Sequence, residues 1–243
     1  MRIMSGQFAC RKMNRSGGYH MLELARSMVT RCRAVILPRF GGPDVLEIRD
    51  DVEVPDLKAD EVLVRSRAVS VNPLDTRMRA GYGRSIFEPL LPLILGRDVS
   101  GEVAAVGASV RSLRVGQEVF GALHPTAARG TYTEYAILPE SELTKKPEQM
   151  SHVFVPNVSV SGPPLATAVL SKKQLQYQMS HGIDYSWVYM RADPEGLQEI
   201  RRLCDAGKFN IPVEKTYPIT QVREAHEAKD KRIIIGKVVL EVD

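Results

Sequence analysis

The sequence has few cysteines and no long apolar run, and both absences limit what the chain can be. None of its three cysteines, Cys10, Cys32 and Cys204, belongs to a C-x-x-C pair. Neither a disulfide framework nor a cysteine-rich zinc site is therefore expected. The longest nearly uninterrupted apolar stretch, Pro89–Leu95, contains two prolines and is far shorter than a membrane span. With 243 residues, of which 44% are apolar and 26% charged, the chain has a globular composition and no predicted membrane span.

Charge is distributed unevenly along the chain. Residues 1–33 carry seven basic residues against Glu23 alone, whereas the remaining residues carry 26 basic and 28 acidic groups. The sequence pI of about 9.0 thus comes from the N-terminal residues. A slightly acidic body lacks the basic surface that nucleic acids require, so we expect no nucleic-acid partner.

The N-terminal residues 1–32 have the composition of an organelle-targeting leader. They are rich in arginine, contain serine and methionine, and are almost free of acidic residues. This composition is typical of a mitochondrial transit peptide, with a plastid transit peptide as the alternative. Tyr19–Val29 could form its basic amphipathic helix. A disordered N-terminus without a targeting role is the other interpretation.

From Arg33 the pattern becomes that of short strands. Apolar or alternating runs occur at residues 34–37, 61–68, 99–106, 119–123 and 131–138, and glycines between several of them indicate turns. Many short strands at close spacing predict an all-β barrel or sandwich over residues 33–150.

After residue 150 the pattern becomes partly helical. Asp193 is expected to cap a helix that begins at Pro194 and stops at Gly207. A second helix is expected after Thr220, and Lys237–Val242 reads as a closing strand. Together with the preceding strands, these elements predict an α+β chain.

The segment Ser70–Gly83, SVNPLDTRMRAGYG, contains the most informative residues. Pro73 disfavours helical backbone at Asn72 and suits the first turn of a helix. Asn72 can therefore cap that helix, and Asp75 lies three residues later, where a carboxylate is favourable. Taken alone, the segment predicts a short, well-capped helix between two strands.

Four segments together indicate a family. They are residues 70–83; residues 96–107 (GRDVSGEVAAVG) with 113–121 (LRVGQEVFG); residues 130–138 (GTYTEYAIL); and residues 206–239. In this order they resemble the medium-chain dehydrogenase/reductase superfamily, and more narrowly its zinc-independent quinone-oxidoreductase-like branch. Within that branch, the chain is similar to the mitochondrial reticulon-interacting NADPH oxidoreductases of plant type. The resemblance covers roughly residues 33–152 and 162–242.

The resemblance implies a GroES-like β-barrel catalytic domain at residues 33–150, into which a Rossmann domain is normally inserted. Residues 186–243 would return to complete the catalytic domain with helices and a strand. Zinc-dependent relatives need a cysteine near Asn72 and a Gly-His-Glu triplet where this chain has Gly96-Arg97-Asp98. Because neither position offers the required ligands, we expect no catalytic zinc.

The resemblance also implies an activity, namely hydride transfer from NADPH to a small quinone or enone, with the cofactor supplying the reactive group. Asn72 would contact the nicotinamide end, with Asp75 and Lys237 as further cofactor-binding candidates. Asp75 is equally explained by helix capping, and Lys237 by a solvated position at a strand end. Tyr82 is the candidate acid or orienting group beside the substrate carbonyl, and its alternative is a half-buried aromatic at a turn.

The chain departs from the family in its nucleotide-binding part. It has no G-x-G-x-x-G turn, and only some two dozen residues stand where most of a Rossmann domain would lie. Residues 151–185 are expected to be a remnant of that domain, with most of it deleted. We therefore expect impaired reductase activity. The alternative is a truncated gene product or a non-catalytic GroES-like module that dimerises or binds a protein partner.

Overall fold

The computed structural model describes residues 31–148, 150–153, 193–208, 212–231 and 236–242. The strands are β1 (Arg31–Leu37), β2 (Glu47–Glu53), β3 (Glu61–Val71), β4 (Leu93–Ile94), β5 (Asp98–Val106), β6 (Glu118–Ala122), β7 (Tyr135–Pro139), β8 (Leu143–Lys145), β9 (Val213–Pro218) and β10 (Lys237–Glu241). The α-helices are α1 (Pro73–Arg79), α2 (Arg84–Phe87), α4 (Pro194–Asp205) and α5 (Val222–Asp230).

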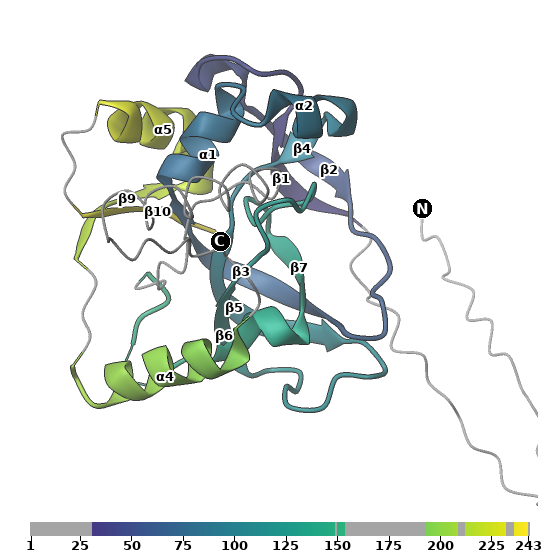
Figure 1. Cartoon of the computed structure of the whole chain (residues 1–243), viewed down its shortest axis with the longest axis vertical. Helices are drawn as coiled ribbons and strands as arrows, with labels where there is room; N and C mark the ends of the chain where they lie inside the picture. Colours follow the sequence, from purple (N-terminus) through teal and green to yellow (C-terminus); the bar gives the residue numbers. More distant parts are fainter. Residues whose placement is uncertain (1–30, 149, 154–192, 209–211, 232–235, 243) are drawn as a thin grey trace, which may run out of the picture.

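Two sheets form the body of the molecule (Figure 1). The smaller sheet has the order β2-β1-β4, and the larger has the order β8-β6-β5-β3-β10-β9, with β7 also paired to β3. The stretch before β7 joins them, because the Val35 N–H donates to the Tyr132 carbonyl at 2.9 Å and the Glu134 N–H donates to the Arg33 carbonyl at 2.9 Å. The sheets therefore share one apolar core.

Strand β3 is the centre of the larger sheet. Along one edge it pairs with β5; along the other, residues 61–65 pair with β7 and residues 68–71 pair with β10. Because β3 has partners on both edges, most of its side chains are buried. The C-terminal strands β9 and β10 thus complete a sheet whose other strands come from residues 61–145.

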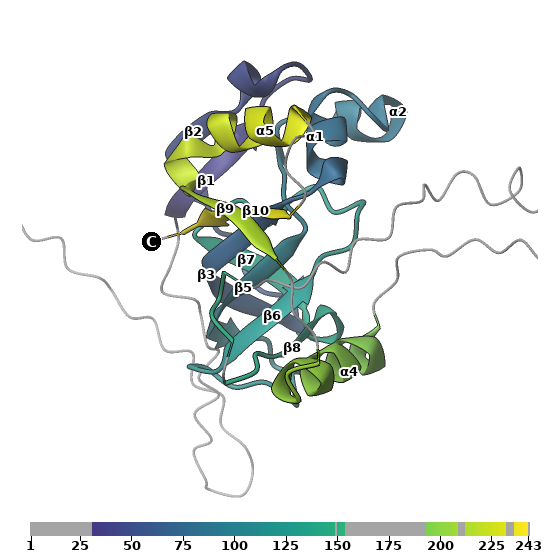
Figure 2. The ribbon, with the colours of Figure 1, turned by 90° about the vertical axis from the view of Figure 1, so that its left-hand side faces the viewer.

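The helices lie at the two ends of the barrel (Figure 2). Helix α4 lies at the end near β8, whereas α1 and α5 lie together at the opposite end, beside β1 and β2 (Figures 1 and 2). The Asp193 side chain caps α4 by accepting the Gly196 N–H at 3.0 Å, and Gly207 follows the helix with a φ of 64°. These start and stop signals agree with those expected from the sequence. Among the described residues, no helix is long and apolar enough to cross a bilayer.

The expected strands are present with one notable difference. The expected strand over residues 131–138 begins only at Tyr135. The reason is that Thr131 and Thr133 use their hydroxyls to bond backbone carbonyls, Thr131 to Asp98 at 2.8 Å and Thr133 to Arg33 at 3.2 Å. This stretch therefore crosses between the sheets instead of extending one of them.

Some predicted segments lie outside the described residues. The predicted leader at residues 1–32 overlaps the structure only where β1 begins, and the predicted remnant at residues 151–185 overlaps it only at residues 151–153. The described residues contain no strand–glycine-turn–helix unit of the kind that opens a Rossmann fold.

The closing role of β10 leads to a test of stability. Leu240 on this strand is completely buried in the main core, so Leu240→Ala removes buried methyl groups and leaves a cavity. We expect a loss of about 2–5 kcal/mol in the free energy of unfolding, measured by urea titration. Val115→Ala, at a side chain that is 62% exposed, is the control and should change stability by less than about 0.5 kcal/mol. Equal unfolding midpoints for the two variants would show that β10 is not part of the cooperative core.

Candidate functional site

The junction between β3 and α1 positions the first candidate residue. Asn72 has extended backbone (φ −102°, ψ 159°) and is the N-cap residue of α1, with Pro73 in the first turn. Its backbone N–H donates to the Asp75 carboxylate at 2.8 Å. The predicted capped helix is thus confirmed, and Asp75 holds the strand-to-helix turn closed.

A buried polar cluster surrounds the Asn72 side chain, and its members come from three parts of the chain. Lys237 Nζ donates to Asn72 Oδ1 at 2.6 Å, and Asn72 Nδ2 donates to Asp98 Oδ2 at 2.8 Å. Ser70 Oγ donates to the same Asp98 oxygen at 2.5 Å. Ser70 lies near the end of β3 and Asn72 directly follows this strand, whereas Asp98 begins β5 and Lys237 begins β10. We call these four residues the amide cluster.

The amide cluster pairs one positive charge with one negative charge away from water. Lys237 Nζ lies 3.4 Å from Asp98 Oδ2, and the exposed fraction of Lys237 is only 7%. Lys237 is therefore not the solvated strand-end lysine of the alternative interpretation. Removing either partner would leave a buried charge without compensation, which is strongly destabilising.

Asp75 lies beside the cluster as a second buried carboxylate. Its two oxygens accept the backbone N–H groups of Asn72 at 2.8 Å and Gly96 at 3.1 Å. Burial raises the pKa of Asp75 to about 6, although the positive charge of Arg97 and the two N–H groups act in the opposite direction. Gly96 has a φ of 87°, and a Cβ atom there would collide with the Tyr132 ring. A glycine is therefore needed for the backbone to approach Asp75 so closely.

Arg97 places a buried guanidinium near both carboxylates. It donates to the carbonyls of Gly96 at 2.9 Å and Ala127 at 3.0 Å, and its exposed fraction is 1%. The charge of Arg97 favours ionised Asp75, and the charges of Asp75 and Asp98 favour charged Arg97. Arg97 thus offsets part of the cost of burying two acids within one region.

A directed chain of hydrogen bonds connects Asp75 to helix α5. An arginine can only donate, so Arg79, 3.3 Å from Nδ1 of His226, donates to that nitrogen. The proton of the neutral imidazole then lies on Nε2, which donates to the Tyr132 hydroxyl at 3.2 Å. The hydroxyl in turn lies against the Asp75 carboxyl, so burial and then this carboxyl raise the pKa of Tyr132. Arg79 itself is held by Asp230 at 2.7 Å.

Tyr82, the candidate acid, lies apart from these networks. It follows the C-terminal end of α1, whereas Asn72 precedes the N-terminal end. A seven-residue helix is about 10 Å long, so the two backbones are separated by about that distance. The exposed fraction of Tyr82 is 47%, and its N–H donates to the Arg77 carbonyl at 2.8 Å. The structure thus brings Asn72, Asp75 and Lys237 together and leaves Tyr82 at the surface.

Two members of the amide cluster, Ser70 and Asp98, were not among the residues singled out from the sequence. A signal for Asp98 was available, since it belongs to the Gly96-Arg97-Asp98 triplet that replaces a zinc-ligand motif. Ser70 gave a weaker signal because a single serine in a strand does not by itself indicate a binding site. Only the pairing of β3 with β5 and β10 brings these side chains together.

The described residues match only part of a dinucleotide. The amide cluster offers polar groups suited to the carboxamide of a nicotinamide. For the pyrophosphate, the strand–glycine-turn–helix unit of a Rossmann fold is required, and the described residues contain none. They also contain no group of three or more His, Cys, Asp or Glu side chains that could hold a metal ion. The described residues thus suit only the nicotinamide end of such a cofactor.

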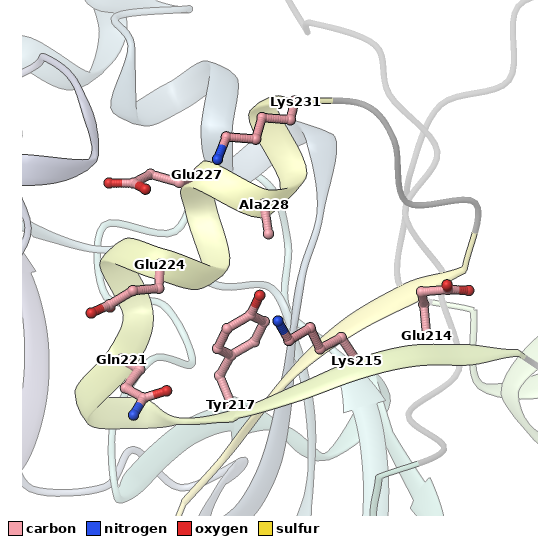
Figure 3. Close-up of a pocket in the computed structure, with 8 residues that line it drawn as sticks. All are labelled: Glu214, Lys215, Tyr217, Gln221, Glu224, Glu227, Ala228 and Lys231. Carbon is pink, nitrogen blue, oxygen red and sulfur yellow. The ribbon is translucent and has the colours of Figure 1, made fainter.

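A separate shallow groove lies between β9 and α5 (Figure 3). Its volume is about 560 Å³, and its lining mixes acidic side chains with lysines. Lys215 Nζ lies 4.7 Å from the centre of the Tyr217 ring. None of the candidate site residues lines this groove.

The buried imidazole predicts a pH-dependent stability. Burial lowers the pKa of His226 from 6.5 to about 3, so between these values the unfolded chain binds a proton that the folded chain excludes. The contribution of His226 to the free energy of unfolding should therefore fall by about 1.4 kcal/mol for each pH unit below pH 6.5. The raised pKa of Asp75 has the opposite effect on stability. The contribution of Asp75 to the free energy of unfolding falls as the pH rises from 3.8 to about 6.

The two effects are separated by comparing wild type with His226→Gln in urea titrations between pH 7.5 and 4.5. The stability advantage of wild type should shrink by about 2.7 kcal/mol over this range. Val115→Ala serves as the control, since its difference from wild type should not depend on pH. A constant difference for His226→Gln would contradict a buried neutral imidazole.

The charge of Arg97 can be tested through Asp75. Arg97→Met keeps a side chain of substantial volume and removes the cation, so the pKa of Asp75 should rise above its value of about 6. The measurement is a pH titration of the Asp75 carboxyl carbon by NMR. Arg111→Met, at an exposed arginine, should leave the midpoint unchanged. Identical midpoints in both variants would show that Arg97 does not act on Asp75.

Comparisons with known proteins agree with this architecture. The family model described as alcohol dehydrogenase GroES-like domain matches residues 58–148, and that described as zinc-binding dehydrogenase matches residues 113–240. Over 123 residues the chain is 37% identical to the mitochondrial NAD(P)H oxidoreductase RTN4IP1 of Dictyostelium discoideum, covering 49% of this chain and 35% of that protein. It is 40% identical over 119 residues to human quinone oxidoreductase, and this match covers 49% of this chain and 34% of that protein.

Another relative extends the alignment. The chloroplastic NADPH-dependent alkenal/one oxidoreductase of Arabidopsis thaliana is 30% identical over 161 residues, covering 64% of this chain and 40% of that protein. The matched regions thus span only about a third to two fifths of these curated relatives.

Solved structures agree in fold. The quinone oxidoreductase from Coxiella burnetii superimposes with a TM-score of 0.71 at 17% identity, covering 88% of this chain and all of that one. The Escherichia coli quinone oxidoreductase complexed with NADPH gives a TM-score of 0.62 at 14% identity. This match covers 86% of this chain and 100% of that one. The expected α+β fold, a GroES-like barrel with C-terminal helices and a truncated second domain, is therefore confirmed. The chain belongs to the medium-chain dehydrogenase/reductase superfamily of oxidoreductases, in its quinone-oxidoreductase-like branch.

Proposed function

We propose that this chain is the substrate-side part of an NADPH-dependent reductase of small quinones or enones, and that it transfers hydride poorly by itself. The observation that carries the proposal is the amide cluster, in which Asn72 and Lys237 meet in a buried polar site at the ends of β3 and β10. The nicotinamide cofactor would supply the hydride, and the protein would orient the nicotinamide and the acceptor.

The proposed roles follow from the position of each residue. Asn72 would contact the nicotinamide end. Lys237 would hold the Asn72 side chain in place through the 2.6 Å hydrogen bond from its Nζ to Asn72 Oδ1. Asp75 would act on the same place indirectly, because it fixes the backbone N–H of Asn72. Its role is thus to keep the turn in shape rather than to touch the cofactor.

Tyr82 is the proposed hydrogen-bond donor to the acceptor carbonyl. Its side chain is 47% exposed, so an acceptor arriving from solvent can reach the hydroxyl without a rearrangement of the core. A phenol is suited to this task because it donates one hydrogen bond and carries no charge that must be desolvated.

Weak cofactor binding is the expected consequence of an incomplete site. Without a strand–glycine-turn–helix unit, the described residues offer the pyrophosphate no Rossmann-type cradle of backbone N–H groups. A few hydrogen bonds at the nicotinamide end supply only about 4 kcal/mol, which corresponds to a Kd of about 1 mM. The chain is therefore proposed to retain acceptor recognition while most of the affinity for NADPH is missing.

The proposal also covers the chemical class of the hydride acceptor and the cellular compartment of the protein. Relatives are described as quinone oxidoreductase and alkenal/one oxidoreductase, which supports both acceptor classes. The mitochondrial and chloroplastic relatives support an organelle as the location. With the arginine-rich residues 1–32, we propose the mitochondrion, which import of the full chain into isolated mitochondria would test.

The activity is tested with the full chain, NADPH and a small benzoquinone or an alkenal. We expect slow acceptor-dependent oxidation of NADPH, followed by the loss of its absorbance, and an NADPH Kd of about 1 mM by fluorescence titration. Asn72→Ala should reduce the oxidation rate by about tenfold or more, because it removes the proposed contact to the nicotinamide end. Ser66→Ala is the control, since its buried hydroxyl lies on the same strand and has no hydrogen-bond partner.

Two results would contradict the proposal in different ways. Micromolar binding of NADPH would show that the missing pyrophosphate cradle is not limiting. Equal rates for wild type and Asn72→Ala, or no oxidation with either acceptor, would remove the reductase assignment. In the latter case a non-catalytic barrel that binds a protein partner or a second copy would become the better description.

A further inference from the structure

His152 lies beyond the last barrel strand, and both nitrogens of its ring are engaged. Its Nε2 atom lies 2.8 Å from Glu118 Oε1, and its Nδ1 atom lies 2.7 Å from Ser100 Oγ. Because a carboxylate only accepts, the proton of the neutral ring lies on Nε2, and Nδ1 accepts the Ser100 hydroxyl. That hydroxyl has only a longer alternative, the Val119 carbonyl at 3.3 Å. The imidazole thus bridges β5 and β6.

A lysine holds the residues just before His152. Lys146 Nζ donates to the Met150 carbonyl and lies 3.1 Å from Glu118 Oε2, and its side chain is only 6% exposed. Glu118 therefore receives the lysine on one oxygen and the imidazole on the other. These contacts fix residues 150–153 to the barrel, and we call these residues the strap.

The end of the strap adds an apolar contact. Val153 packs against Ala68 of β3 and Val239 of β10, which form a small apolar cluster separate from the main core. The strap therefore rests on the face of the larger sheet that is turned away from the main core. With Ser100, these two residues form the floor of the strap.

Each floor residue stands two positions from a member of the amide cluster on the same strand. The pairs are Ala68 and Ser70 on β3, Ser100 and Asp98 on β5, and Val239 and Lys237 on β10. Side chains two positions apart on a strand point to the same face and stand about 7 Å apart. The strap and the amide cluster thus share one face of the sheet, and a ligand that reaches the cluster must lie beside the strap.

We propose that His152 is a positioning residue that pins the strap to the sheet, and that the pinned strap is the wall beside which the nicotinamide end is placed on the amide cluster. The ligand in this inference rests on the proposed function, whereas the pinned strap is a property of the free protein. Releasing His152 moves the wall without touching any member of the cluster.

Acid should release the strap. Burial lowers the pKa of His152 below 6.5; Glu118 on β6 opposes this shift, and the charges of Lys146 and of Arg67 on β3 add to it. Glu102 on β5 lies 3.9 Å from Arg67 and offsets part of that charge. A released histidine therefore binds a proton more readily than the pinned one. The strap should be fully pinned above pH 6.5, and the pinned fraction should fall as the pH drops below this value.

The pinned strap is tested by NMR on the full chain as wild type, His152→Ala and His152→Gln. At pH 7.5, wild type should show nuclear Overhauser contacts from the Val153 methyl groups to those of Ala68 or Val239, and His152→Ala should lose them. His152→Gln should restore them, because its amide can also accept one hydrogen bond and donate another. Below pH 6.5 the contacts should weaken in wild type but not in His152→Gln. Glu148→Gln, at an exposed residue just before the strap, is the control.

The wall is tested by steady-state oxidation of NADPH with a small benzoquinone. We expect kcat/KM of His152→Ala to fall about fivefold, mainly through a higher KM for NADPH, because the wall places the nicotinamide end. His152→Gln and Glu148→Gln should stay near wild type. A loss of stability alone would reduce the amount of folded protein and hence kcat, and it would leave KM unchanged.

Each way of failing has a separate meaning. Missing methyl contacts in wild type overturn the pinned strap, whatever the rates are. Lost contacts in His152→Ala with unchanged kcat/KM overturn the wall. If folded wild type oxidises no NADPH, the proposed function fails and the wall fails with it, while the methyl contacts still decide whether the strap is pinned.

A second variant covers the case in which His152→Ala does not fold. Glu118→Ala removes the acceptor of the His152 Nε2 proton at a side chain that is 52% exposed, so the core is left intact. The methyl contacts of Val153 should weaken in this variant. Contacts as strong in Glu118→Ala as in Glu148→Gln would overturn the proposal.

Discussion

The antiparallel pairing of the last strand with β3 is the contact on which the site depends. Val238 pairs with Val71 and Val239 with Ser70, so Lys237 reaches Asn72 from the far end of the chain. A slip of one residue would turn every side chain of β10 to the opposite face of the sheet. The buried apolar residues of β10 prevent such a slip, since they would then lose their place in the core. Core packing thus determines the position of a charged group.

Two polar networks restrain Asn72, one at its side chain and one at its backbone N–H. The amide cluster holds its side chain through Asp98 and Lys237, while Asp75 holds its N–H. The second network continues through Tyr132 and His226 to α5, the helix that precedes β10. The segments that bring Asn72 and Lys237 together are therefore connected twice, once through the sheet and once through the buried imidazole.

Local signals in the sequence predicted the helices well. Asn72 and Asp193 begin helices, and Gly207 follows one, as the capping rules require. Strand β2 gave no such signal because its charged sequence, EIRDDVE, hides the alternation of a half-exposed strand. The start of β7 was misplaced because the hydroxyls of two threonines compete for backbone groups.

The candidate site was predictable only in part, and the reason is its long-range construction. Asn72 and Lys237 were named through the resemblance, but their contact spans 165 residues of sequence. Asp98 was visible only as a residue that replaces part of a zinc-ligand motif, and its three donors come from two other segments, the end of β3 and the start of β10. No local pattern encodes such a convergence, since it arises from the strand order β5-β3-β10.

The stability of the barrel does not by itself explain the amide cluster. Burying an ammonium and a carboxylate costs several kcal/mol per ion, and apolar residues of similar volume are often equally stable or more stable in such places. Asp98 moreover keeps one oxygen without a partner, which a group selected only for stability would avoid. Stability alone therefore does not account for the cluster, and this favours the cofactor-binding role that we propose for it.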